Sequence, residues 1–179
     1  MSTRVVYETP YMRLREDQIR RPDGSDGIYS YVEKPDFALI IAIENGGFHL
    51  IEQYRYPVRS RSWEFPQGTF PDMATGAPEQ LAREELRQET GMAAQVMRHL
   101  GYLHCAKGLA SQGFDVFVAT DLTHGTQELE IEEQDLRHRW FPRRDVEDMI
   151  RRGAITDDST LAAYTLFLLD GGQLQEAGH

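Results

Sequence analysis

Residues 68–92 read GTFPDMATGAPEQLAREELRQETGM, and this stretch decides the fold. Its second half predicts a helix. Pro78 suits a first helical turn, where the missing N–H of proline does no harm, and most of residues 82–89 are good helix formers. Gly91 supplies the left-handed conformation on which many helices end. We therefore expect a helix that begins near Pro78 and ends at Gly91.

Three oxygen-bearing side chains share one face of that helix. Glu85, Gln88 and Glu89 stand at positions i, i+3 and i+4, which places their Cβ atoms roughly 5–6 Å apart. Hard cations such as Mg²⁺ prefer oxygen ligands, and Mg²⁺ is often held by one or two carboxylates together with substrate phosphates. This face is a candidate metal site, and a solvated acidic face is the alternative interpretation.

The same stretch resembles the Nudix box, whose pattern is G-x5-E-x7-R-E-U-x-E-E-x-G-U with U an aliphatic residue. The match consists of Gly68 and residues 85–92. Residues 53–57, QYRYP, resemble the segment before the box in ADP-ribose and nucleotide-sugar pyrophosphatases. The resemblance covers about residues 36–170. It implies a metal-dependent hydrolase that cleaves the diphosphate of a nucleoside diphosphate linked to X, with ADP-ribose or another nucleotide sugar as substrate.

The chain departs from the Nudix pattern in several places, so its box is degenerate. The loop after Gly68 is two residues longer than the pattern. The early Glu of the pattern falls near Gly76, so that carboxylate is absent or displaced to Asp72. The Arg of the R-E pair is Glu84, and the first Glu of the E-E pair is Gln88. A non-catalytic nucleotide-binding Nudix module is therefore an alternative function.

The resemblance implies a set of metal ligands. It carries Glu85 and Glu89 over as ligands, with Glu85 also counted among the catalytic residues, and adds the backbone carbonyl of Gln67. Gln88 can offer only a neutral oxygen, and losing one negative charge predicts weaker cation binding. The expected cofactor is Mg²⁺, with Mn²⁺ as a second possibility.

Three arginines precede the box. Arg55, Arg59 and Arg61 suit a diphosphate because guanidinium groups make paired, charge-assisted hydrogen bonds to phosphate; solvated loop arginines are the alternative. By resemblance, Glu64 lies near the substrate or the metal, or else is a structural partner for an arginine. All four residues are candidates for substrate binding.

Two segments after the helix are expected to complete the site. Residues 104–111 are rich in small side chains and are expected to line the site opposite the helix. They include Cys105, which we interpret as a small buried hydrophobe because no partner pattern indicates a nucleophile. Residues 123–134, THGTQELEIEEQ, form an acidic loop. By resemblance Glu132 or Glu133 is the catalytic base or a further metal ligand, and solvated carboxylates are the alternative.

The order of elements predicts the α/β class. The resemblance implies a Nudix fold, an α/β/α sandwich around a mixed sheet, over residues 36–179, and residues 1–35 form a small β-sheet extension. Such a sheet often packs on or exchanges with a second subunit in nucleotide-sugar pyrophosphatases, so the resemblance implies a homodimer. A sheet folded back on its own domain is the alternative. Residues 161–169 are apolar nearly all round and predict a buried helix.

Amino-acid composition and net charge limit the kinds of molecule that this protein is expected to bind. The formal net charge is −10, and Lys34 and Lys107 are the only lysines. This balance opposes nonspecific nucleic-acid binding, and it opposes a dinucleoside-polyphosphate or RNA-end pyrophosphohydrolase, which the sequence FPQG at residues 65–68 favours. The sequence has no apolar run near 18 residues, no signal-peptide core and one cysteine. We expect a cytoplasmic protein that acts on a small nucleotide sugar and binds no membrane.

Overall fold

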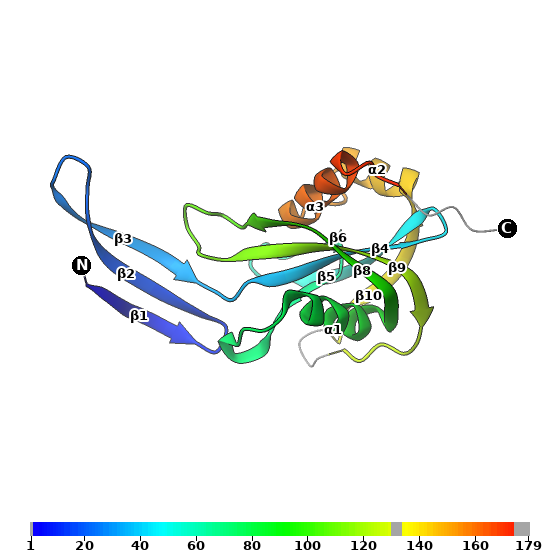
Figure 1. Cartoon of the computed structure of the whole chain (residues 1–179), viewed down its shortest axis with the longest axis horizontal. Helices are drawn as coiled ribbons and strands as arrows, with labels where there is room; N and C mark the ends of the chain where they lie inside the picture. Colours follow the sequence, from blue (N-terminus) through cyan, green and yellow to red (C-terminus); the bar gives the residue numbers. More distant parts are fainter. Residues whose placement is uncertain (1, 130–133, 174–179) are drawn as a thin grey trace.

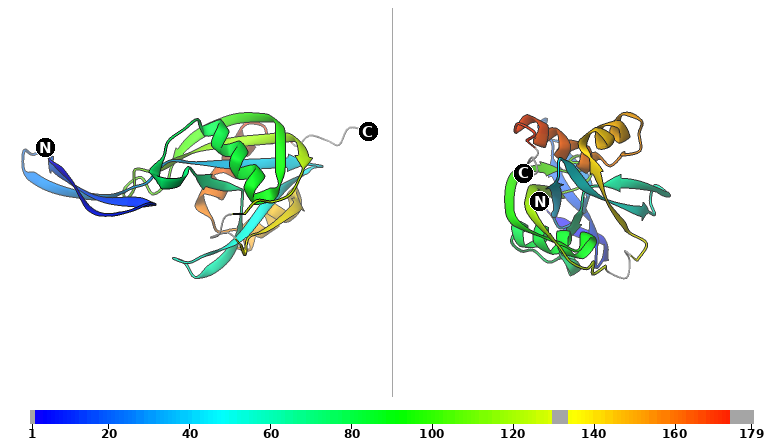
Figure 2. Two further views of the ribbon diagram at one scale, coloured as in Figure 1. Left: turned by 90° about the horizontal axis from the view of Figure 1, so that it is seen from below. Right: turned by 90° about the vertical axis from the view of Figure 1, so that its right-hand side faces the viewer.

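The computed structural model describes residues 2–129 and 134–173, and within them it contains two separate sheets (Figure 1). The smaller sheet is N-terminal and has three antiparallel strands in the order β1-β2-β3. These strands are β1 (Thr3–Thr9), β2 (Met12–Arg20) and β3 (Asp26–Glu33). This sheet extends away from the rest of the molecule as an arm (Figures 1 and 2).

The larger sheet has seven strands. They are β4 (Phe37–Glu44), β5 (Gly47–Arg55), β6 (Ser60–Glu64), β7 (Gln67–Thr69), β8 (Met92–His104), β9 (Gly113–His124) and β10 (Arg137–Pro142). The strand order is β10-β5-β4-β9-β8, with β6 on β5 and β7 on β4. Strands β4 and β9 run parallel and the other named pairs are antiparallel, so the sheet is mixed. Strand β4 is a continuous apolar run because both of its faces are buried.

Helices cover both faces of the larger sheet. Helix α1 (Pro78–Thr90) lies on one face, and helices α2 (Arg143–Arg151) and α3 (Asp158–Leu169) lie on the other (Figures 1 and 2). Each face has its own buried cluster, with Leu86 and Phe117 on the α1 side and Phe48 and Phe167 on the other. The expected α/β/α sandwich around a mixed sheet is therefore confirmed. No helix in the described part of the chain is long and apolar enough to cross a membrane.

The helix ends follow the sequence signals. Helix α1 has Pro78 in its first turn and ends at Gly91, whose φ is 74° and whose N–H donates to the Arg87 carbonyl, as expected. Helix α3 begins where the Asp157 carboxylate accepts a hydrogen bond from the Thr160 N–H. The expectation of a helix buried all round was wrong at its C-terminal end, where Leu168 is 41% and Leu169 is 80% exposed among the described residues.

A histidine cluster joins the strand ends that flank the acidic loop. His124 ends β9 before the loop, and His138 lies in β10 after it. The Glu44 carboxylate accepts hydrogen bonds from His124 Nε2 at 2.9 Å and from His49 Nε2 at 3.3 Å. A carboxylate can only accept, so His49 Nδ1 is left as the acceptor for His138 Nε2–H at 2.9 Å. This arrangement requires a neutral His49, which uses one ring nitrogen as a donor and the other as an acceptor.

We predict that this cluster makes the protein less stable as the pH falls. Burial, with the charges of His49 and His124, lowers the pKa of His138 to about 4, and burial lowers the pKa of His49 against the opposing effect of Glu44. Between about pH 6.5 and 4 the unfolded chain therefore binds protons that the folded chain excludes. The free energy of unfolding should fall over this range by roughly 1–2 kcal/mol, less than full linkage gives because His138 is partly exposed.

Urea unfolding at a series of pH values measures this effect. His138→Gln should flatten the pH dependence between pH 4 and 6.5, whereas the control His104→Gln, an exposed position outside the cluster, should keep it. An unchanged slope in His138→Gln would contradict the assignment.

Candidate active site

Two carboxylates of helix α1 converge on the turn that opens strand β7. The Glu89 side chain is fully buried, and its Oε2 accepts a hydrogen bond of 2.9 Å from the Gln67 N–H. The Glu85 carboxylate packs on the next residue, Gly68, where an added Cβ would lie only 2.4 Å from it. Residues one helical turn apart thus share one short piece of backbone. Glycine is required at position 68 because a side chain there would displace Glu85.

This pair is the arrangement that a hard cation needs. Glu85 is 8% exposed and Glu89 is fully buried, so little solvent reaches either carboxylate. The described residues contain no group of three or more His, Cys, Asp or Glu side chains that could hold a metal ion. Within this part of the chain, the donors therefore have to be two carboxylates and backbone oxygen, a set that suits Mg²⁺. Gln67, Glu85 and Glu89 fit such an ion.

The other candidate metal and base residues lie differently. Gln88 is half-buried, does not line the cavity described below, and its backbone carbonyl accepts from the Glu128 N–H at 3.0 Å. Asp72 is exposed in a 3-10 turn and does not line that cavity either. Glu132 and Glu133 fall outside the described residues, so their roles stay predictions.

The first residues of the acidic loop are hydrogen-bonded to the C-terminal end of helix α1. The Gly125 N–H donates to the Gly91 carbonyl at 2.7 Å, and the Gln127 side-chain amide donates to the Glu89 carbonyl at 2.5 Å. Arg87 and Glu128 add an ion pair. The C-terminal carbonyls of α1, which no helical N–H can reach, are thereby satisfied by the loop.

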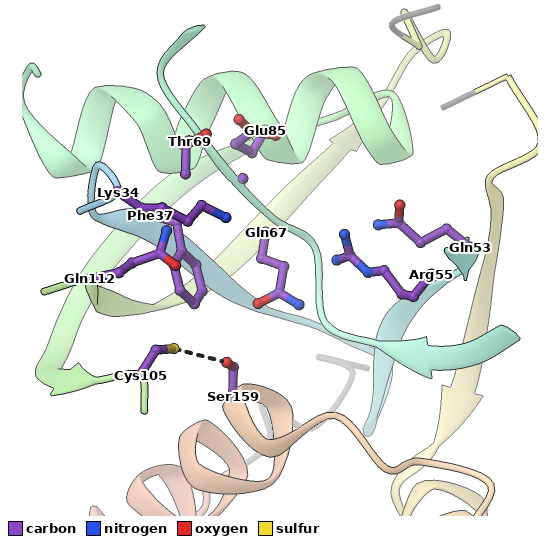
Figure 3. A pocket seen from close by; sticks show the side chains of 11 residues that line it. Lys34, Phe37, Gln53, Arg55, Gln67, Thr69, Glu85, Cys105, Gln112 and Ser159 are labelled. Carbon is purple, nitrogen blue, oxygen red and sulfur yellow. Dashed lines mark hydrogen bonds between the residues drawn. The ribbon is translucent and has the colours of Figure 1, made fainter. Parts of the chain in front are cut away.

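A cavity of about 360 Å³ opens beside the Glu85 carboxylate (Figure 3), and the fully buried Glu89 is not among the residues that line it. Its walls come from the segment between β3 and β4, the start of β4, and from β5, β7, α1, the β8–β9 loop and the start of α3. The lining residues are Lys34, Phe37, Gln53, Arg55, Gln67, Gly68, Thr69, Glu85, Cys105, Gln112 and Ser159. The expectation that the segment after β8 contributes to the site opposite α1 agrees with the position of Cys105.

One of the three arginines reaches this cavity. Arg55 lines it and contacts Glu64 Oε1 at 2.6 Å, and the same oxygen accepts from Gln53 at 2.8 Å. Glu64 is 1% exposed and does not line the cavity, so it orients Arg55. Burial raises the pKa of Glu64, against the lowering effect of the Arg55 guanidinium.

The other two arginines lie elsewhere. Arg61 is held by the side chains of Glu52 and Asp135, and Arg59 is exposed in the turn before β6 with a φ of 51°. Neither residue lines the cavity, and their roles in substrate binding stay predictions.

Sequence reasoning did not identify several residues of the cavity, among them Ser159 and Lys34. Ser159 lies 3.7 Å from the sulfur of Cys105, across the cavity floor. Burial raises the pKa of the Cys105 thiol, while Ser159 and Lys34 oppose that rise, so this cysteine is poorly suited to be a nucleophile. Lys34 precedes the first strand of the large sheet, and no motif identifies it; its rarity as a lysine was the only signal.

Comparisons with known proteins identify the family of this chain. The sequence profile of the NUDIX domain matches residues 33–164, and that of the nucleoside diphosphate sugar hydrolase N-terminal domain matches residues 1–32. The chain is 31% identical to an ADP-ribose pyrophosphatase of Mycobacterium tuberculosis, over 90% of this chain and 79% of that protein. It is 27% identical to a methanol dehydrogenase activator of Bacillus methanolicus, over 69% of this chain and 66% of that protein.

A solved structure shares the fold. The crystal structure of an ADP compounds hydrolase superposes with a TM-score of 0.80 at 19% sequence identity, over 96% of this chain and 91% of that one.

We predict that Gly68→Ala weakens divalent-cation binding at least tenfold while changing the thermal unfolding midpoint little. The new Cβ must push away the Glu85 carboxylate, which is the mobile end of its side chain, so the fold loses little. Isothermal titration calorimetry with Mn²⁺ measures the affinity. The control is Gly108→Ala, where nothing lies within 4 Å of the added Cβ and binding should be unchanged. Equal affinities in the two variants would show that Glu85 is not a ligand.

Proposed function

Because the chain belongs to the Nudix family of pyrophosphatases, we propose that it hydrolyses the diphosphate of a nucleotide sugar, with ADP-ribose as the preferred candidate. The products are a nucleoside monophosphate and a sugar phosphate. The observation that carries the proposal is the convergence of Glu85 and Glu89 on Gln67 and Gly68 at the edge of a cavity. The names of the matched relatives support the choice of substrate.

The proposed cofactor is Mg²⁺. Glu85, Glu89 and the backbone carbonyl of Gln67 would hold it. When bound there, the cation neutralises diphosphate charge and lowers the pKa of a water, which makes hydroxide available near neutral pH.

Arg55 is the side chain that we expect to stabilise negative charge on the substrate. Its guanidinium lines the cavity and is fixed by Glu64, so its position is set before the substrate arrives. Preorganised donors stabilise charge that develops on a leaving phosphate without reorganising during the reaction. A carboxylate takes the proton from the attacking water, and Glu132 or Glu133 is the proposed base.

The degenerate box is compatible with turnover. Gln88 does not line the cavity, and Glu84 accepts a hydrogen bond from Gln80 on the helix surface at 2.9 Å. Glu85 and Glu89, the two carboxylates that face the turn, are retained. The departures at positions 84 and 88 therefore change the surroundings of the proposed metal site and not its two carboxylate ligands. This favours an enzyme over a non-catalytic nucleotide-binding module.

A substrate panel tests the proposal. ADP-ribose, other nucleotide sugars, diadenosine polyphosphates and capped RNA are each incubated with Mg²⁺ or Mn²⁺, and products are resolved by chromatography. We expect nucleotide sugars to be cleaved with the highest kcat/KM and EDTA to stop the reaction. Preferential cleavage of diadenosine polyphosphates or capped RNA would show that the proposed substrate class is wrong. Cleavage of none of these compounds would favour a non-catalytic nucleotide-binding module.

Glu89→Gln should reduce turnover by at least a thousandfold and leave the fold intact. The amide oxygen can still accept the hydrogen bond from the Gln67 N–H, but the negative charge that attracts the cation is lost. Steady-state kinetics gives the activity, and circular dichroism with thermal unfolding checks the fold. Wild-type rates in this variant would remove Glu89 from the proposed metal site.

We propose further that the N-terminal extension, residues 1–35, forms a homodimer. Its sheet exposes large apolar side chains that a monomer leaves in water: Val5, Val6, Tyr7, Tyr11, Ile28 and Tyr29. Large exposed apolar side chains gathered on one small element are a common mark of a protein interface. The sheet also makes few contacts with its own large sheet and extends from it as an arm (Figure 2).

Ile28→Asp should convert the dimer to a monomer, because a charge would be buried at the interface. Ile28 is 60% exposed in the single chain, so the substitution should cost the monomer little. Leu169→Asp, at an exposed leucine on α3, is the matched control and should remain dimeric. Analytical ultracentrifugation distinguishes the two, and a wild-type protein that sediments as a monomer at all concentrations would disprove the proposal.

A further inference from the structure

The linker between the two sheets is held rigidly where it passes the cavity. Residues 34–36 join β3 to β4, and backbone and side-chain hydrogen bonds fix the chain on both sides of Lys34. The Val32 N–H donates to the Leu109 carbonyl and the Ser111 N–H donates to the Val32 carbonyl (2.9 Å each). Gln112 Nε2 donates to the Pro35 carbonyl (2.7 Å), and the Gly113 N–H donates to Asp36 Oδ1 (2.7 Å). The Lys34 side chain is therefore presented from a fixed backbone.

Lys34 lies at the junction of two cavities. It lines the cavity described above, and its ammonium group points toward the centre of that cavity, on the side where Gly68 and Gln67 pass (Figure 3). It also lines a second cavity, of about 430 Å³, whose apolar wall includes Phe70, Met73 and Leu81. Phe37 is the other residue that the two cavities share. A ligand that reached into both cavities would therefore lie beside Lys34 and Phe37.

Within residues 2–129 and 134–173, Lys34 forms no salt bridge, because no carboxylate oxygen lies within 4 Å of its ammonium. The other basic residues that line the two cavities, in contrast, form salt bridges. Arg55 is paired with Glu64, and Arg13 is paired with Glu8 and Glu33. Lys34 also acts on Cys105 across the cavity. Its charge lowers the pKa of the Cys105 thiol, against the larger raising effect of burial.

We propose that Lys34 binds a phosphate of the substrate in the cavity that Glu85 and Arg55 also line. This inference rests on the proposed function, because it takes the substrate to be a nucleotide with a diphosphate. A lysine ammonium is a compact charge with three donors, which suits phosphate oxygens that present several directions. The diphosphate lies between Lys34 and the carboxylate pair, and the two halves of the substrate extend from it into the two cavities.

Chemical labelling tests the contact without turnover. The chain has two lysines, so acetylation with an N-hydroxysuccinimide ester, followed by peptide mass spectrometry, reports on Lys34 with Lys107 as an internal control. Lys107 is exposed and lines neither cavity. In the presence of EDTA, saturating ADP-ribose should slow acetylation of Lys34 at least fivefold and leave Lys107 unchanged. Equal labelling with and without ADP-ribose, once calorimetry has shown that it binds, overturns the inference.

Kinetics gives a second, independent readout. Lys34→Gln should raise KM on the order of tenfold, the usual loss for one charge-assisted hydrogen bond, with a smaller effect on kcat. Lys34→Arg keeps the charge and should recover much of the loss, and Lys107→Gln should match the wild type. Wild-type kinetics in Lys34→Gln, or a defect in Lys34→Arg as large as in Lys34→Gln, overturns the inference.

The two proposals can fail separately. If nucleotide sugars are cleaved but Lys34→Gln behaves as the wild type, the inference fails and the proposed function stands. If no diphosphate is cleaved but ADP-ribose protects Lys34 from acetylation, the proposed function fails and the phosphate contact stands.

Discussion

The hydrogen bond from the Gln67 N–H to the buried Glu89 carboxylate is the interaction on which the site depends. It joins strand β7 to helix α1 and fixes where the second carboxylate, Glu85, meets Gly68. A buried carboxylate would otherwise be expensive, and a backbone N–H supplies part of the compensation. The geometry is therefore a consequence of folding that is in place before any ligand binds, as a preorganised site requires.

The opposite layer of the sandwich stabilises the same turn. Thr160, fully buried in the first turn of α3, accepts a hydrogen bond from the Phe65 N–H at 3.0 Å. Asp157 caps that helix and also accepts from the Gln67 side-chain amide at 3.4 Å. Backbone pairing with β4 holds the turn in the sheet. The short segment between β6 and α1 is thus clamped from both helical layers, which explains how two residues of one turn can be positioned so closely.

Local signals in the sequence predicted the parts that local physics controls. Pro78 and Gly91 marked the ends of α1, and the spacing of Glu85 and Glu89 placed both on one face. Local signals could not predict contacts between segments that are far apart in the sequence. Nothing near Arg61 indicates that Asp135 would hold it away from the cavity, and nothing near Lys34 indicates that residues 109–113 would fix its backbone beside Arg55 and Gly68. The exposure of Leu169 was missed for the same reason, since it depends on what the rest of the chain leaves uncovered.

The central claim is that Glu85, Glu89 and the Gln67 carbonyl together hold a divalent cation against a diphosphate. A crystal grown with Mn²⁺ and a non-hydrolysable ADP-ribose analogue, with data collected at the manganese absorption edge, tests it most directly. The account predicts an anomalous peak bonded to both carboxylates and to the carbonyl, with analogue phosphate oxygens on its open side. A peak elsewhere, or ordered analogue in the cavity with both carboxylates turned away from it, would contradict the account.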